Sequence, residues 1–135
     1  MAEYVFKDMV RKAGLEGVYE IDSAATSREE IGNDIYPPAK KVLTAHGIPF
    51  GHHHARQMTR QDLDYYDYIV AMEEYNLQNI SRLFGNSALE KISLLMDYTD
   101  RHGNVSDPWY TGDFETAYRD IKDGCCGLIS QLSMK

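Results

Sequence analysis

The sequence contains no apolar run that approaches the length of a membrane-spanning helix, so we expect no membrane partner. It is also short of basic residues, because 14 Lys and Arg stand against 21 Asp and Glu and give a formal net charge of −7. This deficit argues against a general affinity for nucleic acid, which requires a basic surface. The N-terminus does not resemble a signal peptide, and we therefore expect a cytoplasmic protein.

Cysteine is scarce as well. Cys125 and Cys126 are adjacent, so they form neither a disulfide framework nor a zinc-binding pattern, and they suit a reducing compartment. The run His52-His53-His54 is the other candidate metal site. Imidazoles on an extended segment point to alternating sides, and no Cys, Asp or Glu at ligand spacing completes the set. We expect neither a metal nor a cofactor.

The remaining composition, 43% hydrophobic and 26% charged over 135 residues, is that of a single globular domain spanning residues 1–135. Apolar periodicity predicts an opening amphipathic helix, and Thr59 and Asp62 form a capping-box pattern. Strands are predicted at Val18–Ala25, Tyr68–Met72 and Lys91–Met96, and further helices at residues 37–47, 73–84 and 114–132. This alternation predicts an α/β fold with a parallel sheet that is flanked by helices on both faces.

The chain begins inside a helix, although a doubly wound sheet normally begins with a strand. No Ser, Thr, Asp or Asn precedes this helix as a cap. We therefore expect that the first strand of the sheet is missing from the sequence. Ligands of such sheets bind where the loop after the first strand enters the first helix, so the ligand site is expected there too.

The stretch VSDPWY, residues 105–110, carries the most chemistry. A carboxylic acid at Asp107 could protonate a leaving oxygen if aromatic surroundings raise its pKa. Trp109 and Tyr110 could form the wall of a slot for a flat aryl group. The alternative is an Asp-Pro turn whose aromatic neighbours cover the core.

Five stretches, MAEYVFKDMVRKAGL, EIDSAATS, HHARQMT, DYIVAMEEYNL and DPWYTGDFETAYRDI, stand in this order along the chain. Together they resemble the low-molecular-weight protein tyrosine phosphatase family. The resemblance implies a four-stranded parallel sheet with helices on both sides. It also implies an active site on a C-x5-R-[ST] phosphate loop directly before MAEY, whose cysteine attacks the phosphorus while the arginine and loop amides hold the phosphoryl oxygens.

The same resemblance assigns roles to five residues of this chain. It implies that Asp107 is the general acid, and that Trp109 and Tyr110 are the aromatic wall of the substrate site. Ser23 and His53 resemble residues that brace the phosphate loop through hydrogen bonds. The alternatives are a buried hydroxyl at the end of a strand for Ser23 and an ordinary surface imidazole for His53.

Two departures from the family pattern limit what these residues can do. Neither Cys125 nor Cys126 is followed by five residues and an Arg, and both are interpreted as small core residues. Glu29 stands near a position where the family often has an aromatic residue that contacts the substrate. We expect this chain to be inactive, although the complete protein would hydrolyse a phosphotyrosine protein or an aryl phosphate. The alternative is a non-catalytic relative that binds an anion or a partner.

The resemblance implies that the first strand is central in the sheet, between the strands at Val18–Ala25 and Tyr68–Met72, so its absence has an energetic consequence. It removes three or four buried apolar side chains at about 1.5–3 kcal/mol each. It also leaves two ladders of hydrogen bonds unmade, at roughly 0.5–1.5 kcal/mol per bond. The sum rivals a typical domain stability of about 5–15 kcal/mol. We therefore expect the gap to be closed by pairing of the flanking strands, by a moved helix, or by an element from another copy in a homo-oligomer.

Overall fold

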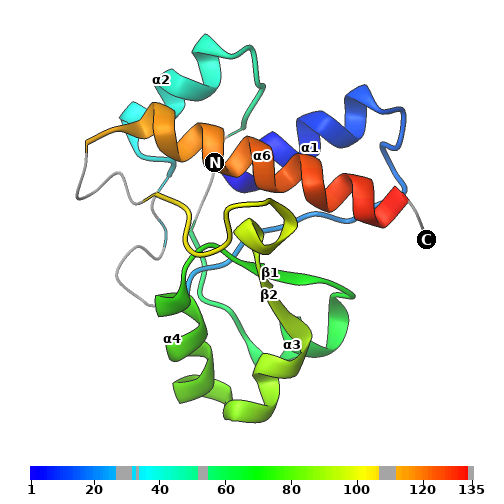
Figure 1. Cartoon of the computed structure of the whole chain (residues 1–135), viewed down its shortest axis with the longest axis vertical. Helices are drawn as coiled ribbons and strands as arrows, with labels where there is room; N and C mark the ends of the chain where they lie inside the picture. The colour runs from blue at the N-terminus through cyan, green and yellow to red at the C-terminus, as the bar shows by residue number, and fades with distance from the viewer. Residues whose placement is uncertain (27–31, 33, 52–54, 107–111, 134–135) are drawn as a thin grey trace.

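The computed structural model of the chain describes residues 1–26, 32, 34–51, 55–106 and 112–133. Strands lie in its middle layer, with α1 and α6 on one side and α3 and α4 on the other (Figure 1). This arrangement confirms the predicted α/β class. The elements in chain order are α1 (Ala2–Lys12), α2 (Pro37–Ala45), α3 (Arg60–Tyr65), β1 (Ile69–Ala71), α4 (Glu74–Phe84), η1 (Asn86–Lys91), β2 (Ile92–Leu94), η2 (Leu95–Tyr98) and α6 (Phe114–Ser133).

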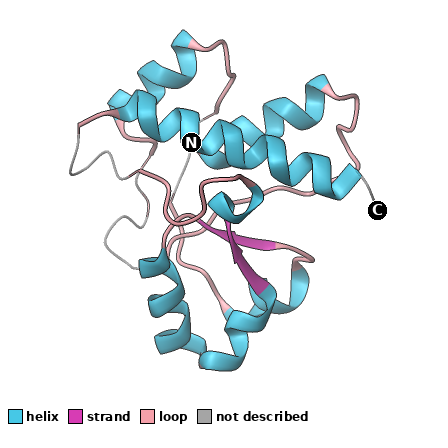
Figure 2. Cartoon of the chain, viewed as in Figure 1, coloured by secondary structure: helices cyan, strands magenta, loops and turns pink. Residues whose placement is uncertain are grey.

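The sheet of the described residues consists of β1 and β2, which pair in parallel (Figure 2). Ile69 stands opposite Ile92 in this register. Successive side chains of a strand point to opposite faces of a sheet, and β1 follows this rule. Val70 packs against the core cluster beneath α1 and α6, whereas Ile69 packs against the cluster that contains Leu63 and Ile80. The parallel sheet is thus confirmed, with strands shorter than predicted.

The strand predicted at Val18–Ala25 is wrong. Within the described part of the chain, residues 18–24 have no sheet partner, and Ala25 forms an isolated parallel bridge with Gln57. A strand requires a hydrogen-bonded neighbour, and no strand of the described residues pairs with this segment. Val18 is accordingly 63% exposed. The closure route in which this segment pairs with β1 is therefore also wrong.

The strand predicted at Tyr68–Met72 is shorter in the structure, where β1 comprises Ile69–Ala71. Of the three residues in β1, Ile69 and Val70 are half-buried and Ala71 is buried. The predicted strand Lys91–Met96 is likewise shortened, because Leu95 begins the 3-10 helix η2. On the side of β1 that faces away from β2, no further strand of the described residues continues the sheet.

The predicted helices are confirmed by the structure. The capping box of α3 is present, since the backbone N–H of Thr59 donates to Asp62 Oδ2 at 2.8 Å. Helix α4 ends at Gly85, whose φ of 91° lies in the left-handed region that favours glycine. Because each of these signals is local, a sequence pattern was sufficient to find them.

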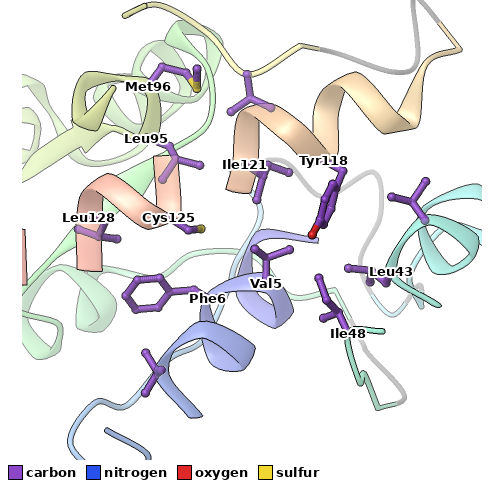
Figure 3. Close-up of a cluster of buried hydrophobic side chains, with 13 residues drawn as sticks. Val5, Phe6, Leu43, Ile48, Leu95, Met96, Tyr118, Ile121, Cys125 and Leu128 are labelled. Carbon is purple, nitrogen blue, oxygen red and sulfur yellow. The ribbon is translucent and has the colours of Figure 1, made fainter. Parts of the chain in front are cut away.

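The main core lies between α1 and α6. Phe6 of α1 faces Cys125 and Leu128 of α6, as the labelled side chains show (Figure 3). Helix α6 also lies directly against η2, because a Cβ atom at Gly127 would stand 1.9 Å from the carbonyl oxygen of Tyr98. These contacts fix the layer that covers one face of the sheet.

Candidate active site

A cavity of about 860 Å³ lies between the extended residues 18–24 and β1. Phe6, Cys125 and Leu128 line it from the side of α1 and α6, and Ile80 of α4 lines it as well. Residues from both sides of the sheet therefore meet around this cavity.

Ser23 lines this cavity and is one of the predicted site residues that the structure describes. Its Oγ donates a hydrogen bond of 2.5 Å to Oε1 of Glu3 in the first turn of α1. Lys7 Nζ donates to the other oxygen of Glu3 at 2.6 Å. Ser23 is therefore held at the N-terminal end of α1. That it braces a phosphate loop stays a prediction.

Thr26 is fixed at the same cavity by two asparagines that the sequence analysis missed. The side-chain amides of Asn76 and Asn79 donate to Thr26 Oγ1 at 3.4 and 3.0 Å. Asn79 is buried in α4, next to the core residue Ile80. A buried polar side chain requires a partner, so an Asn beside an apolar position in the helical pattern was the signal that could have revealed it.

Asp120 of α6 anchors the segment that leads into residues 107–111. Its Oδ2 accepts a 2.9 Å hydrogen bond from the backbone N–H of Ser106, and its Oδ1 accepts one of 2.8 Å from Arg101. The neighbouring N–H of Val105 donates to the carbonyl of Met72 at 2.9 Å, directly after β1. Asp120 is buried, and it also escaped the sequence analysis. An acidic residue among the apolar positions of the last helix was the sequence signal that could have revealed it.

Arg56 lines the cavity but is already paired with two carboxylates. Its guanidinium donates to Asp62 at 2.9 and 3.2 Å and to Asp22 at 3.1 Å. The hydrogen bond from Arg56 lowers the pKa of Asp62, and the same bond raises the pKa of Arg56 above its usual value. An arginine that is neutralised in this way is poorly placed to hold a phosphate.

Cys125 lies on the floor of the cavity, where burial raises the pKa of its thiol to about 12. A thiol with this pKa stays protonated at neutral pH, and the thiolate is the nucleophilic form. Cys125 therefore behaves as a small apolar residue, which agrees with its interpretation from the sequence. Cys126, the next residue, is exposed, so its interpretation as a core residue is wrong.

The other predicted site residues lie outside the described residues. They are the general acid Asp107, the substrate-binding candidates Trp109, Tyr110 and Glu29, and the loop-supporting candidate His53. Thr26, Arg56 and Ser106 are described residues within three positions of Glu29, His53 and Asp107 respectively, and all three line the same cavity. The three chain segments that lead to these residues therefore converge.

Among the described residues, no group of three His, Cys, Asp or Glu is placed to hold a metal ion. The run 52–54 lies outside them. None of the helices in the described ranges is long and apolar enough to cross a membrane.

Comparison with known proteins identifies the family. The model of the low molecular weight phosphotyrosine protein phosphatase family matches residues 1–135. The low molecular weight protein-tyrosine-phosphatase YfkJ of Bacillus subtilis is 38% identical over 134 residues, which are 98% of this chain and 86% of that protein. The human low molecular weight phosphotyrosine protein phosphatase is 37% identical over 136 residues, covering 97% and 85% of the two chains.

The fold agrees with these matches. The crystal structure of YfkJ from Bacillus subtilis superimposes with a TM-score of 0.92 at 37% identity, covering 98% of this chain and 85% of that one. The Streptococcus pyogenes enzyme gives a TM-score of 0.86 at 34% identity, covering 97% and 82%. This chain therefore belongs to the low-molecular-weight protein tyrosine phosphatase family.

Proposed function

We propose that these 135 residues supply the scaffold and the general acid of a phosphatase that hydrolyses phosphotyrosine proteins or aryl phosphate monoesters. We further propose that they do not catalyse this reaction by themselves. The observation that carries this proposal is that the family match spans the whole chain, yet no Cys within it is followed by five residues and an Arg. The reducing compartment that suits the two cysteines supports a cytoplasmic setting.

The proposed chemistry proceeds in two steps. A cysteine thiolate attacks the phosphorus, and the bond between phosphorus and the aryl oxygen breaks as Asp107 gives its proton to that oxygen. Water then attacks the phosphocysteine and gives a proton to the Asp107 carboxylate, as the bond between sulfur and phosphorus breaks. This step releases phosphate and regenerates both the thiolate and the protonated acid. A phenol has a pKa of ~10, so protonating the oxygen makes it a better leaving group.

The hydrogen bonds of the two residues before Asp107 support that role. Asp120 holds the N–H of Ser106 at 2.9 Å, and Val105 is tied to the end of β1. The neighbouring segment is thus fastened to both α6 and the sheet. General acid catalysis contributes typically 10²–10⁴-fold, which is why Asp107 without a nucleophile gives no turnover.

Hydrolysis of p-nitrophenyl phosphate tests the proposal. The 135-residue chain is expected to show no turnover above buffer. A chimera that carries a strand and a C-x5-R-[ST] loop ahead of Met1 is expected to turn over. In that chimera, Asp107→Asn should lower kcat by about 10²–10⁴-fold for phenyl phosphate, and by less for an ester whose leaving group is more acidic.

Two results would contradict the proposal. One is turnover by the 135-residue chain that Cys125→Ser abolishes, since this would make a cysteine of α6 the nucleophile. The other is a folded chimera that binds phosphate but never turns over. That second result would favour the alternative function, a non-catalytic relative that binds an anion or a partner.

A further inference from the structure

The segment 104–106 is attached to three different elements of the fold. The first attachment is to α4, because the side-chain oxygen of Asn104 accepts a 2.8 Å hydrogen bond from the backbone N–H of Glu74. The N–H groups of the first turn of a helix have no acceptor within the helix, so a side chain from elsewhere in the chain can bind them. The second attachment is to the sheet, since the N–H of Val105 donates to the carbonyl of Met72 and its side chain is buried in the main core.

The third attachment is to α6, through the carboxylate of Asp120. Its Oδ2 accepts the 2.9 Å hydrogen bond from the N–H of Ser106, and its Oδ1 accepts the 2.8 Å hydrogen bond from Arg101. Asp120 is only 6% exposed. With both oxygens bound, this carboxylate is held in one orientation toward Ser106.

The first turn of α4, to which Asn104 binds, is itself held by other contacts. The side-chain oxygen of Asn76 accepts a 2.9 Å hydrogen bond from the N–H of Glu73. The side-chain amide of Asn76 donates to Thr26 at 3.4 Å, and that of Asn79 donates to the same hydroxyl at 3.0 Å. Asn104 therefore joins a turn that is already fixed to a second chain segment.

We propose, on the basis of the proposed function, that Asn104 and Asp120 are positioning residues for the proton transfer from Asp107. Asp107 itself lies outside the described residues, and the two positioning residues act on it through segment 104–106. A general acid must lie within hydrogen-bond reach of the oxygen that it protonates. A displacement of about 1 Å can cost on the order of 10²-fold in rate, so the three attachments of this segment bear directly on catalysis.

The 135-residue chain provides the first test, because Trp109 is its single tryptophan and stands three positions after Ser106. Acrylamide quenching of its fluorescence is measured under native conditions. Asn104→Ala and Asp120→Ala are each expected to raise the quenching constant by about 1.5-fold or more, since each frees one attachment of the preceding segment. Asn104 is exposed, so its variant gives an answer even if Asp120→Ala does not fold.

Two control variants are expected to match the parent in this assay. Asn104→Asp keeps a side-chain oxygen that can accept the N–H of Glu74. Gly127→Ala destabilises the chain through a clash with Tyr98, without removing a hydrogen bond of segment 104–106. A rise in quenching in Gly127→Ala would show that any loss of stability changes the signal, which would overturn the proposal.

The second test uses the chimera that carries a strand and a C-x5-R-[ST] loop ahead of Met1. Asn104→Ala and Asp120→Ala are each expected to lower kcat for phenyl phosphate by about tenfold or more, and to lower it less for p-nitrophenyl phosphate, whose leaving group is more acidic. In an Asp107→Asn background neither substitution should lower kcat further, because a positioning residue acts only through the acid. Asn104→Asp should restore kcat for phenyl phosphate.

Three results would overturn the proposal: unchanged quenching of Trp109 in both alanine variants, an equal loss of kcat for the two esters, or losses that add to that of Asp107→Asn. An equal loss indicates that the substitutions only reduce the amount of folded enzyme. The proposed function fails in a different way, since the chimera then shows no turnover with any ester. In that case the quenching of Trp109 alone decides whether Asn104 and Asp120 control the segment that follows them.

Discussion

The protonation of Cys125 is the sharpest quantitative prediction of the structure. With a pKa of about 12, the thiolate fraction of Cys125 at pH 8 is about 10⁻⁴. An ordinary cysteine with a pKa of ~8.5 is about one quarter thiolate at the same pH. The reactive form is therefore depleted by a factor on the order of 10³, before any loss of access through burial.

Reaction with a disulfide reagent such as DTNB measures this difference. The variant Cys126→Ser isolates Cys125, and we expect its labelling at pH 8 to be at least ~10³-fold slower than that of the exposed Cys126 in Cys125→Ser. In Cys126→Ser the rate should rise about tenfold per pH unit up to pH 10 without a plateau. Urea should expose the thiol and restore ordinary reactivity.

Fast labelling of the native Cys126→Ser variant would refute this reasoning. A plateau of its rate below pH 9 would do the same. Either result would mean that Cys125 is a thiolate in the folded chain, which would restore it as a candidate nucleophile.

Three further substitutions test the packing and the polar contacts. Gly127→Ala should lower the free energy of unfolding in urea by about 1–3 kcal/mol, despite the helix preference for Ala of ~1 kcal/mol, because its Cβ would overlap Tyr98. Asp120→Ala should lower it by about 1.5–3 kcal/mol, since a buried bond to a charged group is lost. Asp62→Asn should destabilise the chain at pH 7, and the difference from the parent should shrink as the pH falls below ~3.9, as measured by urea titration at each pH. Arg56 lowers the folded pKa of Asp62, so this stabilisation is present above ~3.9 and is lost as the pH falls through the folded value.

Matched controls separate these effects from general damage. Cys126→Ala changes an exposed position of the same helix and should stay within about 0.5 kcal/mol of the parent. Asp123→Ala removes the other carboxylate that binds Arg101, at 2.7 Å on the surface, and should cost less than about 1 kcal/mol. A neutral Gly127→Ala, or an Asp123→Ala as severe as Asp120→Ala, would show that the assigned contacts are not the cause.

The helices of this chain could be predicted because their signals are local. The capping pair Thr59 and Asp62, the prolines that open α2 and Gly85 at the end of α4 are all contained in short stretches. The segment 18–25 shows the limit of such reasoning. Its sequence favours a strand, but its structure depends on a neighbour that is distant in the chain.

The residues of the candidate site also divide into one that the sequence revealed and others that it did not. Ser23 was found because a recognisable motif contains it. Asp120 and Asn79 were missed because their importance lies in what they bind, Ser106 in one case and Thr26 in the other. Each partner is more than ten residues away, so only the folded chain reveals why a polar side chain is buried at that position.

The cavity links the stability of this chain to its proposed chemistry. The same volume separates segment 18–24 from β1, joins the two core clusters, and receives the three segments that lead to the predicted site residues. In the chimera, a strand carried ahead of Met1 that packs into this cavity would bury apolar surface in both clusters. The chimera is therefore expected to have a higher melting temperature than the 135-residue chain, as measured by thermal denaturation. A chimera that melts at the same temperature or lower would show that the added strand does not pack into the cavity.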